Sequence, residues 1–251
     1  TDRGLALLSS DRNSTREKRN SQTERTLRAV ASWERIFGGV KTGVRAGYTY
    51  DDLRYLMESD PDGQGNFTPV TDARSRIHTL FSRAEAEYAP NEKWVFAANV
   101  SAHQHRVHSG DLSLIDATTG RRADTLYRQQ RFELSAFASA KWRPTPRLGI
   151  AADLRWELYG DRSTPLIPAL FVDWLLAKRG NVVLKASAAR NYRYPTLNDL
   201  YFQPGGNPDL DPERGWTWDA GVESSLKSRR SSLRLSATAF DSRIDDWMLW
   251  I

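Results

Sequence analysis

The chain of 251 residues contains no cysteine. This absence excludes a disulfide framework and thiolate metal sites, and it is neutral about the cellular compartment. No apolar run reaches the roughly 18 residues that a transmembrane helix needs, so none is predicted. The opening stretch lacks a basic segment followed by an apolar run, so no signal peptide is predicted either.

A strong charge of either sign is also missing. The 36 Lys and Arg residues face 31 Asp and Glu residues, and the net charge of +5 is spread along the chain, which favours no nucleic-acid partner. No Ser-His-Asp order, Gly-rich phosphate loop or catalytic carboxylate pair stands out, so no enzyme is predicted. Hydrophobic residues make up only 39%, yet there are nine tryptophans, and this combination needs an explanation.

The explanation is strict alternation of apolar and polar residues. In residues 147–159, the even positions from Leu148 to Leu158 are apolar, whereas Asp153 and Arg155 fall on the other parity. This is typical of a strand with one apolar face. About ten such strands are predicted, near 24–36, 40–56, 75–89, 93–106, 126–143, 147–159, 165–177, 181–192, 215–226 and 232–244. Their lengths suit a tilted membrane-spanning strand of about 9–11 residues or more better than a soluble strand of about five or six.

The connections between these strands also alternate in length. Tight turns are predicted at Gly38-Gly39, Pro90-Asn91, Pro144–Pro146, Arg179–Asn181 and Ser228–Arg230. Longer loops are predicted near 58–72, 106–125 and 192–214, and we expect them to be extracellular. Short turns at one end and long loops at the other indicate an all-β, transmembrane, up-and-down antiparallel barrel.

Aromatic residues support this interpretation because they gather at both strand ends on the apolar face. Membrane interfaces favour this distribution. One row lies near the tight turns: Trp33, Tyr88, Trp94, Trp142 and Trp174. The other lies near the long loops: Tyr48, Tyr50, Trp156, Trp216 and Trp218. The charged alternate face predicts a wide, hydrated lumen or one that holds another polar body.

The stretch from Tyr192 to Trp216 is unusual. It carries four of the eleven prolines, a spacing that argues against any helix or central strand. It also carries Leu197, Leu200 and Leu210 with several aromatics, too much apolar surface for a disordered linker. We therefore expect an irregular loop that is held in place.

This stretch resembles a motif of TonB-dependent outer-membrane receptors, especially their cobalamin and siderophore branches. The matching residues are Tyr192, Pro195, Thr196, Leu197, Leu200, Tyr201, Gly206, Asn207, Pro208, Leu210, Pro212 and Glu213. The resemblance implies a 22-stranded barrel with an N-terminal plug and active import across the bacterial outer membrane. The imported ligands would be scarce compounds such as cobalamin, a ferric siderophore or haem, and some members take glycans.

The chain departs from this family pattern in extent. Residues 1–251 are expected to be part of one barrel domain, with the plug, the TonB box and the closing strands outside this chain. The expected partners are the TonB complex through that absent plug and box, outer-membrane lipids, a small ligand such as cobalamin or a siderophore, and a surface lipoprotein; nucleic acid is not expected. Two alternatives stay open at this point, a passive outer-membrane porin and a soluble β-rich carbohydrate-binding module.

The loop itself has two interpretations. It is a structural brace at the barrel mouth, or four of its residues contact the ligand: Tyr194, Asn198, Tyr201 and Asn207. Prolines limit the unfolded states that the loop gives up when it is ordered, which favours the brace.

Two metal sites are weighed against simpler explanations. His103 and His105 share a strand face and could bind one metal, although histidines at a wet strand end are commonly just solvated. Asp60, Asp62 and Asn66 echo the start of a calcium loop, but turn chemistry explains the same residues. Calcium in an extracellular loop is therefore the one cofactor considered.

Overall fold

The computed structural model describes residues 2–3, 18–60, 63–115, 120–202 and 205–248. They form one 12-stranded antiparallel sheet and one short helix. The elements are β1 (Asp2–Arg3), β2 (Lys18–Phe37), β3 (Val40–Ser59), β4 (Thr68–Asn91), β5 (Trp94–Ile115), β6 (Arg122–Thr145), β7 (Leu148–Tyr159), β8 (Arg162–Ser163), β9 (Ile167–Ala177), β10 (Val182–Arg193), α1 (Leu197–Tyr201), β11 (Glu213–Lys227) and β12 (Ser232–Asp245).

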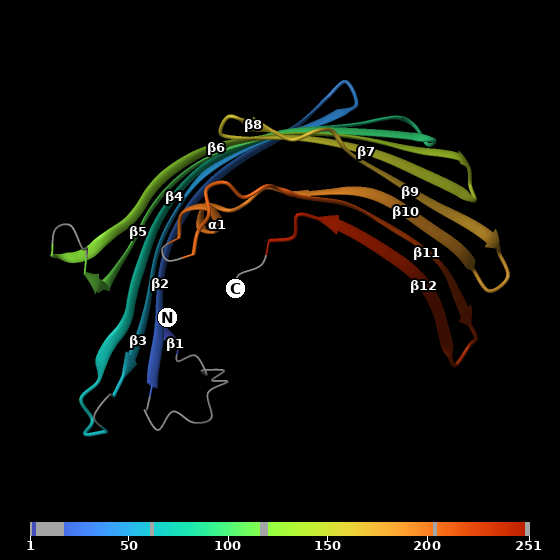
Figure 1. Ribbon diagram of the computed structural model, residues 1–251. Coiled ribbons are helices and arrows are strands. Elements are labelled where there is room, and N and C mark those ends of the chain that lie inside the picture. The colour runs from blue at the N-terminus through green and yellow to red at the C-terminus, as the bar shows by residue number, and fades with distance from the viewer. Residues whose placement is uncertain (1, 4–17, 61–62, 116–119, 203–204, 249–251) are drawn as a thin grey trace.

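The ten long strands predicted from the sequence are confirmed. Each pairs with its neighbour in the chain, and only the two-residue β8 lies off the main path, against β7. Figure 1 shows the sheet bent into an arch with α1 on its concave side. The described sheet runs from β1 to β12 as an open path, so it is the curved wall of an up-and-down barrel.

Because α1 lies on the concave side, a contact with its segment shows which strand residues face the concave side of the sheet and which face outward. Arg131 of β6 donates from Nη1 to the carbonyl oxygen of Pro195, just before α1, so Arg131 faces the concave side. Side chains alternate along a strand, so its neighbours Gln130 and Phe132 face outward. Pair register then extends this assignment across the sheet. In β7 it places Leu148 to Leu158, at even positions, outward, and Asp153 and Arg155 inward.

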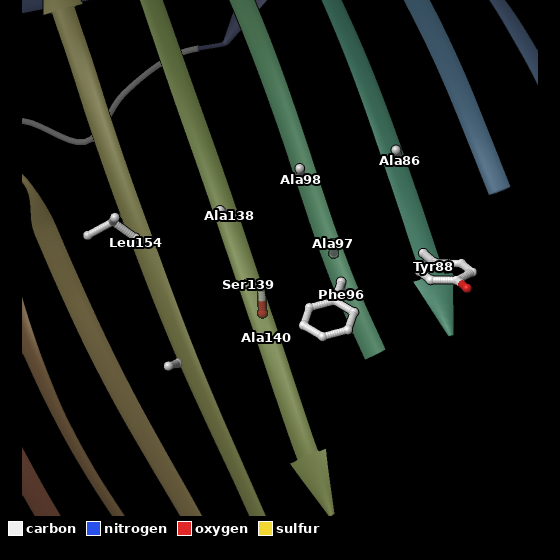
Figure 2. Close-up of a pocket in the computed structure, with 10 residues that line it drawn as sticks. Ala86, Tyr88, Phe96, Ala97, Ala98, Ala138, Ser139, Ala140 and Leu154 are labelled. Atoms are coloured by element: carbon white, nitrogen blue, oxygen red, sulfur yellow. The ribbon is translucent and has the colours of Figure 1, made fainter. Parts of the chain in front are cut away.

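The outward face is apolar over most of its height. A hollow of ≈ 430 Å³ lies near the tight-turn ends, lined by small residues such as Ala98 and Ala138 and by Tyr88, Phe96 and Leu154. Figure 2 shows these lining side chains on neighbouring strands. Large outward side chains remain exposed, including Leu80, Leu170 and Trp174. Such a surface is stable only against lipid, and a water-soluble protein rarely exposes one of this extent.

The two aromatic rows lie where the sequence predicts them. Near the tight turns, Trp94 and Trp142 are paired across β5 and β6 with ring centroids 5.5 Å apart. Near the other end, Trp216 and Trp218 are exposed on β11. The strand segments between these rows are therefore the membrane-spanning segments.

The small apolar core lies at the end of the arch opposite the tight turns. Its buried apolar residues are Val107, Ala123, Ile167 and Leu200, and Pro195 is fully buried. Among the described residues, no helix is long and apolar enough to cross a membrane.

Two of the predicted loops are shorter than expected. Strand β3 continues to Ser59 and β4 already begins at Thr68, so residues 58–59 and 68–72 of the predicted loop 58–72 are strand. Likewise β5 continues to Ile115 and β6 begins at Arg122, within the predicted loop 106–125. Both hairpins therefore project beyond the membrane as paired ribbons.

The reason is a change in the phase of the alternation. Up to Tyr50, apolar residues of β3 face outward towards lipid. Beyond it, Asp52 and Arg54 take the outward positions, and Leu53 and Tyr55 turn to the concave side. A strand that leaves the bilayer meets water on its outward face, so its apolar residues move from the outward positions to the concave ones. This change interrupts the alternation from which the strand was predicted.

The expectation that no helix fits among the prolines is wrong. Helix α1 has five residues and begins directly after Thr196. The Thr196 side chain accepts from the Asp199 backbone N–H (3.1 Å), and the Asp199 carboxylate accepts from the Thr196 backbone N–H (2.8 Å). This capping box satisfies the N-terminal donors, so a helix of little more than one turn fits after Pro195.

Candidate functional site

The candidate site lies on the concave face, where the described residues of segment 194–212 (194–202 and 205–212), here called the mouth segment, fold back over strands β6 and β7. Three strands reach this place: β6 brings Arg131 and Glu133, β7 brings Glu157 and Tyr159, and β10 leads into the segment through Arg193. All face the concave side, at the end of the strands beyond the outer aromatic row.

Arg131 is the centre of the site. Its Nη1 donates to the Pro195 carbonyl oxygen at 2.8 Å, and its Nε donates to Glu133 Oε1 at 2.7 Å. The guanidinium carbon lies 5.5 Å from the ring centroids of both Tyr159 and Tyr194. These two rings stack with centroids 4.8 Å apart. One cation therefore joins strands β6 and β7 to a segment more than 60 residues later in the chain, through a charge-assisted hydrogen bond and cation–π contacts.

A second set of contacts ties the far side of the segment. Arg193 Nη1 donates to Glu213 Oε1 at 3.0 Å, and its Nη2 lies 3.6 Å from Asp199 Oδ2. The backbone N–H of Asn207 donates to the Asp199 carbonyl oxygen at 3.0 Å. Both carboxylates are nearly buried, with side-chain exposures of 8% and 11%. Buried acidic groups need such partners, so Arg193 holds the two ends of the segment together.

Burial also sets the protonation of the site. Desolvation, with the nearby Glu157 carboxylate as the next cause, raises the pKa of Tyr159 to about 12. The Tyr159 hydroxyl therefore stays protonated near neutral pH and donates to Glu157 Oε2 at 3.2 Å. The site as a whole is a positively charged guanidinium surrounded by aromatic rings and carboxylates, an arrangement suited to holding a polar ligand or a loop rather than to proton transfer.

The four residues proposed as ligand contacts have different surroundings. Tyr194 stacks on Tyr159. The ring centroid of Tyr201 lies 6.3 Å from that of Tyr127 in β6. The Asn207 side chain accepts from the Asp209 backbone N–H at 2.9 Å, which is turn capping. Asn198 is exposed on α1, and its side chain forms no hydrogen bond with the described residues. The surroundings of Tyr194, Tyr201 and Asn207 support the brace, and Asn198 is the one with its polar group turned to solvent.

The two histidines lie side by side on the concave face, with ring centroids 5.8 Å apart. His105 is engaged at both nitrogens: Nδ1 lies 3.0 Å from Thr79 Oγ1, and Nε2 lies 3.6 Å from Glu133 Oε2. Within the described ranges, no group of three or more His, Asp or Glu residues is placed to hold a metal ion. The metal site at His103 and His105 stays a prediction.

The calcium prediction falls partly outside the described residues, because Asp62 lies there. The Asp60 carboxylate accepts from the backbone N–H groups of Gly63 (3.0 Å) and Gly65 (2.7 Å). This geometry is that of a capped turn, in which both oxygens already have donors. Asn66 has an interaction of its own, and calcium at this loop stays a prediction.

Sequence reasoning missed Arg131, Tyr159, Glu157 and Arg193. The alternation placed Arg131 on the polar face but could not distinguish it from the other charged residues there. Its partner Pro195 is 64 residues away, and no local pattern reports a contact at that separation. The signal that could have helped is the aromatic side chain of Tyr159 on the lumen parity of β7, because an aromatic on a hydrated face needs a packing partner.

A lipid-facing meander with two aromatic rows and a mouth segment folded to the concave side defines the class: the wall of a bacterial outer-membrane barrel. A family described as TonB dependent receptor-like, beta-barrel matches residues 2–250, and the chain belongs to this family. Its location is accordingly the bacterial outer membrane.

Individual relatives cover only parts of either protein. The Vitamin B12 transporter BtuB of Photobacterium profundum is 35% identical over 81 residues, which is 31% of this chain and 13% of the relative. The solved structure of the copper transporter OprC matches 92% of this chain and 40% of its own, with a TM-score of 0.64 and 15% identity. The siderophore receptor PirA from Acinetobacter baumannii matches 90% of this chain and 35% of its own, with a TM-score of 0.64 and 17% identity. At these identities the structures show the shared fold, and the chain spans well under half of each relative.

Proposed function

We propose that this chain is the barrel wall of a TonB-dependent importer that takes up a scarce ligand, with cobalamin as the first candidate and a ferric siderophore or haem next. The observation that supports this function most directly is the mouth segment tied down onto the concave face by Arg131 and Arg193. An importer needs a shaped and constant binding mouth, because affinity depends on groups that are already in place before the ligand arrives.

Cobalamin comes first because of the relative that matches by sequence. A vitamin B12 transporter shares 35% identity over 81 residues, whereas the siderophore and copper proteins match by fold at 17% identity or less. Because this similarity covers only part of the chain, it ranks the candidate ligands. The proposed type of transport is the same for all of them. The partners that go with this function are the TonB complex, which would act through a plug, and a surface lipoprotein.

A passive porin is the competing function, and the site argues against it. A porin needs an open route, while here segment 194–212 lies over the concave face and is held through Pro195, Asp199 and Glu213. The concave face still carries charged pairs such as Lys41 with Glu87 and Lys185 with Glu223, which suit a hydrated interior filled by a polar body.

The test is uptake by the full-length receptor that carries this barrel. It is expressed in a bacterial strain that lacks its own cobalamin receptor, and radiolabelled cyanocobalamin is supplied at nanomolar concentration with and without a functional TonB. We expect accumulation that needs TonB. Accumulation that is independent of TonB would identify a porin. No cyanocobalamin accumulation, together with TonB-dependent growth on a ferric siderophore or haem, would keep the transport class and change the ligand.

Arg131→Ala supplies a matched variant in the same assay. If the tied mouth segment matters for import, uptake falls although the protein reaches the membrane in normal amount. Arg45→Gln is the control, because Arg45 lies on the concave face of β3 near the tight turns, far along the strand from the mouth. Equal uptake by Arg131→Ala and the unaltered receptor would show that import does not need the mouth segment to be held by Arg131.

A further inference from the structure

The outward face of strands β2 to β6 changes character beyond the outer aromatic row. Pair register places the outward residues of these strands in rows across the sheet. The last mainly uncharged row includes Leu27, Tyr50 and His78. The next row out is charged and consists of Arg25, Asp52, Arg76, His108 and Arg128, one residue from each of the five strands.

Arginines of the neighbouring rows widen this charged row. Arg106 lies beside His78 one row nearer the membrane, and Arg54 pairs with Arg74 one row farther out. We call these six arginines the outward basic band: Arg25, Arg54, Arg74, Arg76, Arg106 and Arg128. The acidic side chains among them are Asp52, Asp72 and Asp124, with Glu58 close enough to act on Arg54, so six arginines face four carboxylates.

The height of the band matches the head groups of the outer leaflet. Asp52, in the charged row, lies twelve residues along β3 from Val40, which pairs with Tyr88 of the inner aromatic row. At about 3.3 Å per residue and a tilt of about 40°, that distance rises about 30 Å across the bilayer. The apolar band of such barrels is about 25 Å tall. On β3 the charged row therefore lies just outside the hydrocarbon, at the level of lipid phosphates.

The arginines of the band fall into two groups. Arg54 binds Asp72 through two hydrogen bonds (2.6 and 2.9 Å), and Arg74 binds Asp52 in the same way (2.7 and 2.6 Å). These pairs neutralise two of the three aspartates. The other four arginines, Arg25, Arg76, Arg106 and Arg128, form no ion pair with any described residue. Within the described part of the chain, four guanidinium groups thus face outward without a carboxylate partner.

A small pocket lies within the band. It measures ≈ 130 Å³ and is lined by Arg74, Arg76, His108, Gly110, Leu112 and Asp124. Guanidinium groups bind phosphate oxygens with paired hydrogen bonds. In this hollow Arg76 is the guanidinium without an ion pair among the described residues, because Arg74 is bound to Asp52 and His108 Nε2 lies 2.8 Å from Thr125 Oγ1. At Gly110 a Cβ would collide with the backbone of Asp124, so β5 and β6 approach closely at this edge of the pocket. The pocket therefore gives the band a hollow beside Arg76 in which a phosphate oxygen can reach its guanidinium group.

The other half of the sheet lacks this feature. There the outer aromatic row continues as Trp156, Trp216 and Trp218 in outward positions of β7 and β11. Of the outward arginines there, Arg190 donates to the Leu166 carbonyl oxygen, and Arg214 and Arg243 pair with Asp246 and Asp241. The band is therefore a local property of β2 to β6 and differs from a general excess of charge at the membrane surface.

We propose that the outward basic band binds the phosphate groups of a phosphorylated lipid of the outer leaflet, with Arg76 and Arg128 as the main contacts and the pocket beside Arg76 as the phosphate position. The lipid's acyl chains then lie on the apolar outward rows of β3 to β6. This inference depends on the membrane location of the barrel and not on which ligand it imports.

The test uses the full-length receptor in detergent and purified lipopolysaccharide as the probe, because that outer-leaflet lipid carries phosphates. Binding is measured with EDTA present, so that no divalent cation bridges lipid and protein. The double variant Arg76→Gln/Arg128→Gln should bind about thirtyfold more weakly, since each arginine near an anionic lipid surface contributes about one kcal/mol. The matched control is Arg28→Gln/Arg45→Gln, which removes the same charge from the concave face and should bind normally.

Three results would overturn the proposal. The first is equal binding by the outward double variant and the control. The second is equal binding of dephosphorylated lipopolysaccharide. The third is displacement of the lipid by inorganic phosphate at millimolar concentration, which would indicate a site for a free anion. If the double variant does not fold into a heat-modifiable barrel, the single variant Arg106→Gln, at the membrane edge of the band, replaces it and should weaken binding several-fold.

Discussion

The two halves of the sheet satisfy their backbone hydrogen-bonding groups at the mouth in different ways. Strands β2 to β6 have 20 to 24 residues, while β7 and β9 to β12 have 11 to 15. The long half continues past the membrane as paired ribbons, and the short half ends near the interface, where its connecting segment folds inward over the concave face (Figure 1). Backbone groups are satisfied in both, by strand pairing in one half and by caps, turns and side chains in the other.

The two halves also differ in the face on which their charged and aromatic side chains make specific contacts. The long half presents charge outward, in the band of arginines at the level of the outer head groups, and its mouth ends are held by backbone hydrogen bonds. The short half concentrates its specific contacts on the concave side, where Arg131, Tyr159 and Tyr194 hold segment 194–212. Loss of single side chains should therefore affect the mouth of the short half more than that of the long half.

The largest effect is expected from Leu200→Ala. Leu200 is 6% exposed and is the anchor of α1 beneath the mouth segment. Removing a buried leucine side chain costs about 2–5 kcal/mol. We expect faster hydrogen exchange in residues 194–212 and a lower thermal midpoint, with exchange in the β3–β4 ribbon unchanged. Leu197→Ala on the same helix is the control, because Leu197 is only half-buried. Equal effects of the two variants would show that Leu200 is no special anchor.

The next effect is on the membrane-spanning part, which both halves share. Ala152 faces outward in β7, and its neighbour Ala151 faces the lumen. Ala152→Arg should destabilise the intact barrel by about 2–4 kcal/mol if position 152 lies near the bilayer midplane, whereas a lumen position tolerates the same change. Urea unfolding in lipid vesicles measures both variants. A larger loss for Ala151→Arg would reverse the assignment of the faces.

The sequence predicted the membrane part of both halves because the information there is local. The period of two along residues 147–159 gave the faces, and the turn residues gave the tight turns. The ribbons were missed because the phase of the alternation inverts after Tyr50, when the outward face meets water instead of lipid. Helix α1 was missed because a single capped turn is too short to have a period. The contact of Arg131 with Pro195 joins distant segments, and only the structure brings them together.

A smaller effect is expected in the long half on acidification. The hydrogen bonds from Arg74 hold the pKa of Asp52 below its usual value of 3.8. A carboxyl with a lowered pKa in the folded state adds stability above its unfolded pKa, and this stability is lost as pH falls through the folded pKa. Between about pH 5 and pH 2, the β3–β4 ribbon should therefore lose at most about 1 kcal/mol, since the pair is partly exposed.

Asp52→Asn provides the control for this pH effect. The variant should be slightly less stable at pH 7 and should show a flatter pH dependence in the ribbon, read from hydrogen exchange of residues 50–76. The mouth segment of the short half should respond in the same way in both proteins. An unchanged pH dependence in the variant would assign the acid sensitivity to another carboxyl group.

The smallest effect is expected for Asn198→Ala, in the middle of the short half's mouth segment. Asn198 is exposed, and its side chain forms no hydrogen bond with the described residues, so the melting curve should not move. If the segment is a brace, ligand affinity should also change by less than about tenfold, or roughly 1.4 kcal/mol. Titration of the full-length receptor with cyanocobalamin, or with the ligand that the uptake assay identifies, measures this. A hundredfold loss of affinity with an unchanged melting curve would make the segment a binding loop, because a polar group that contributes nothing to folding would then contribute directly to recognition.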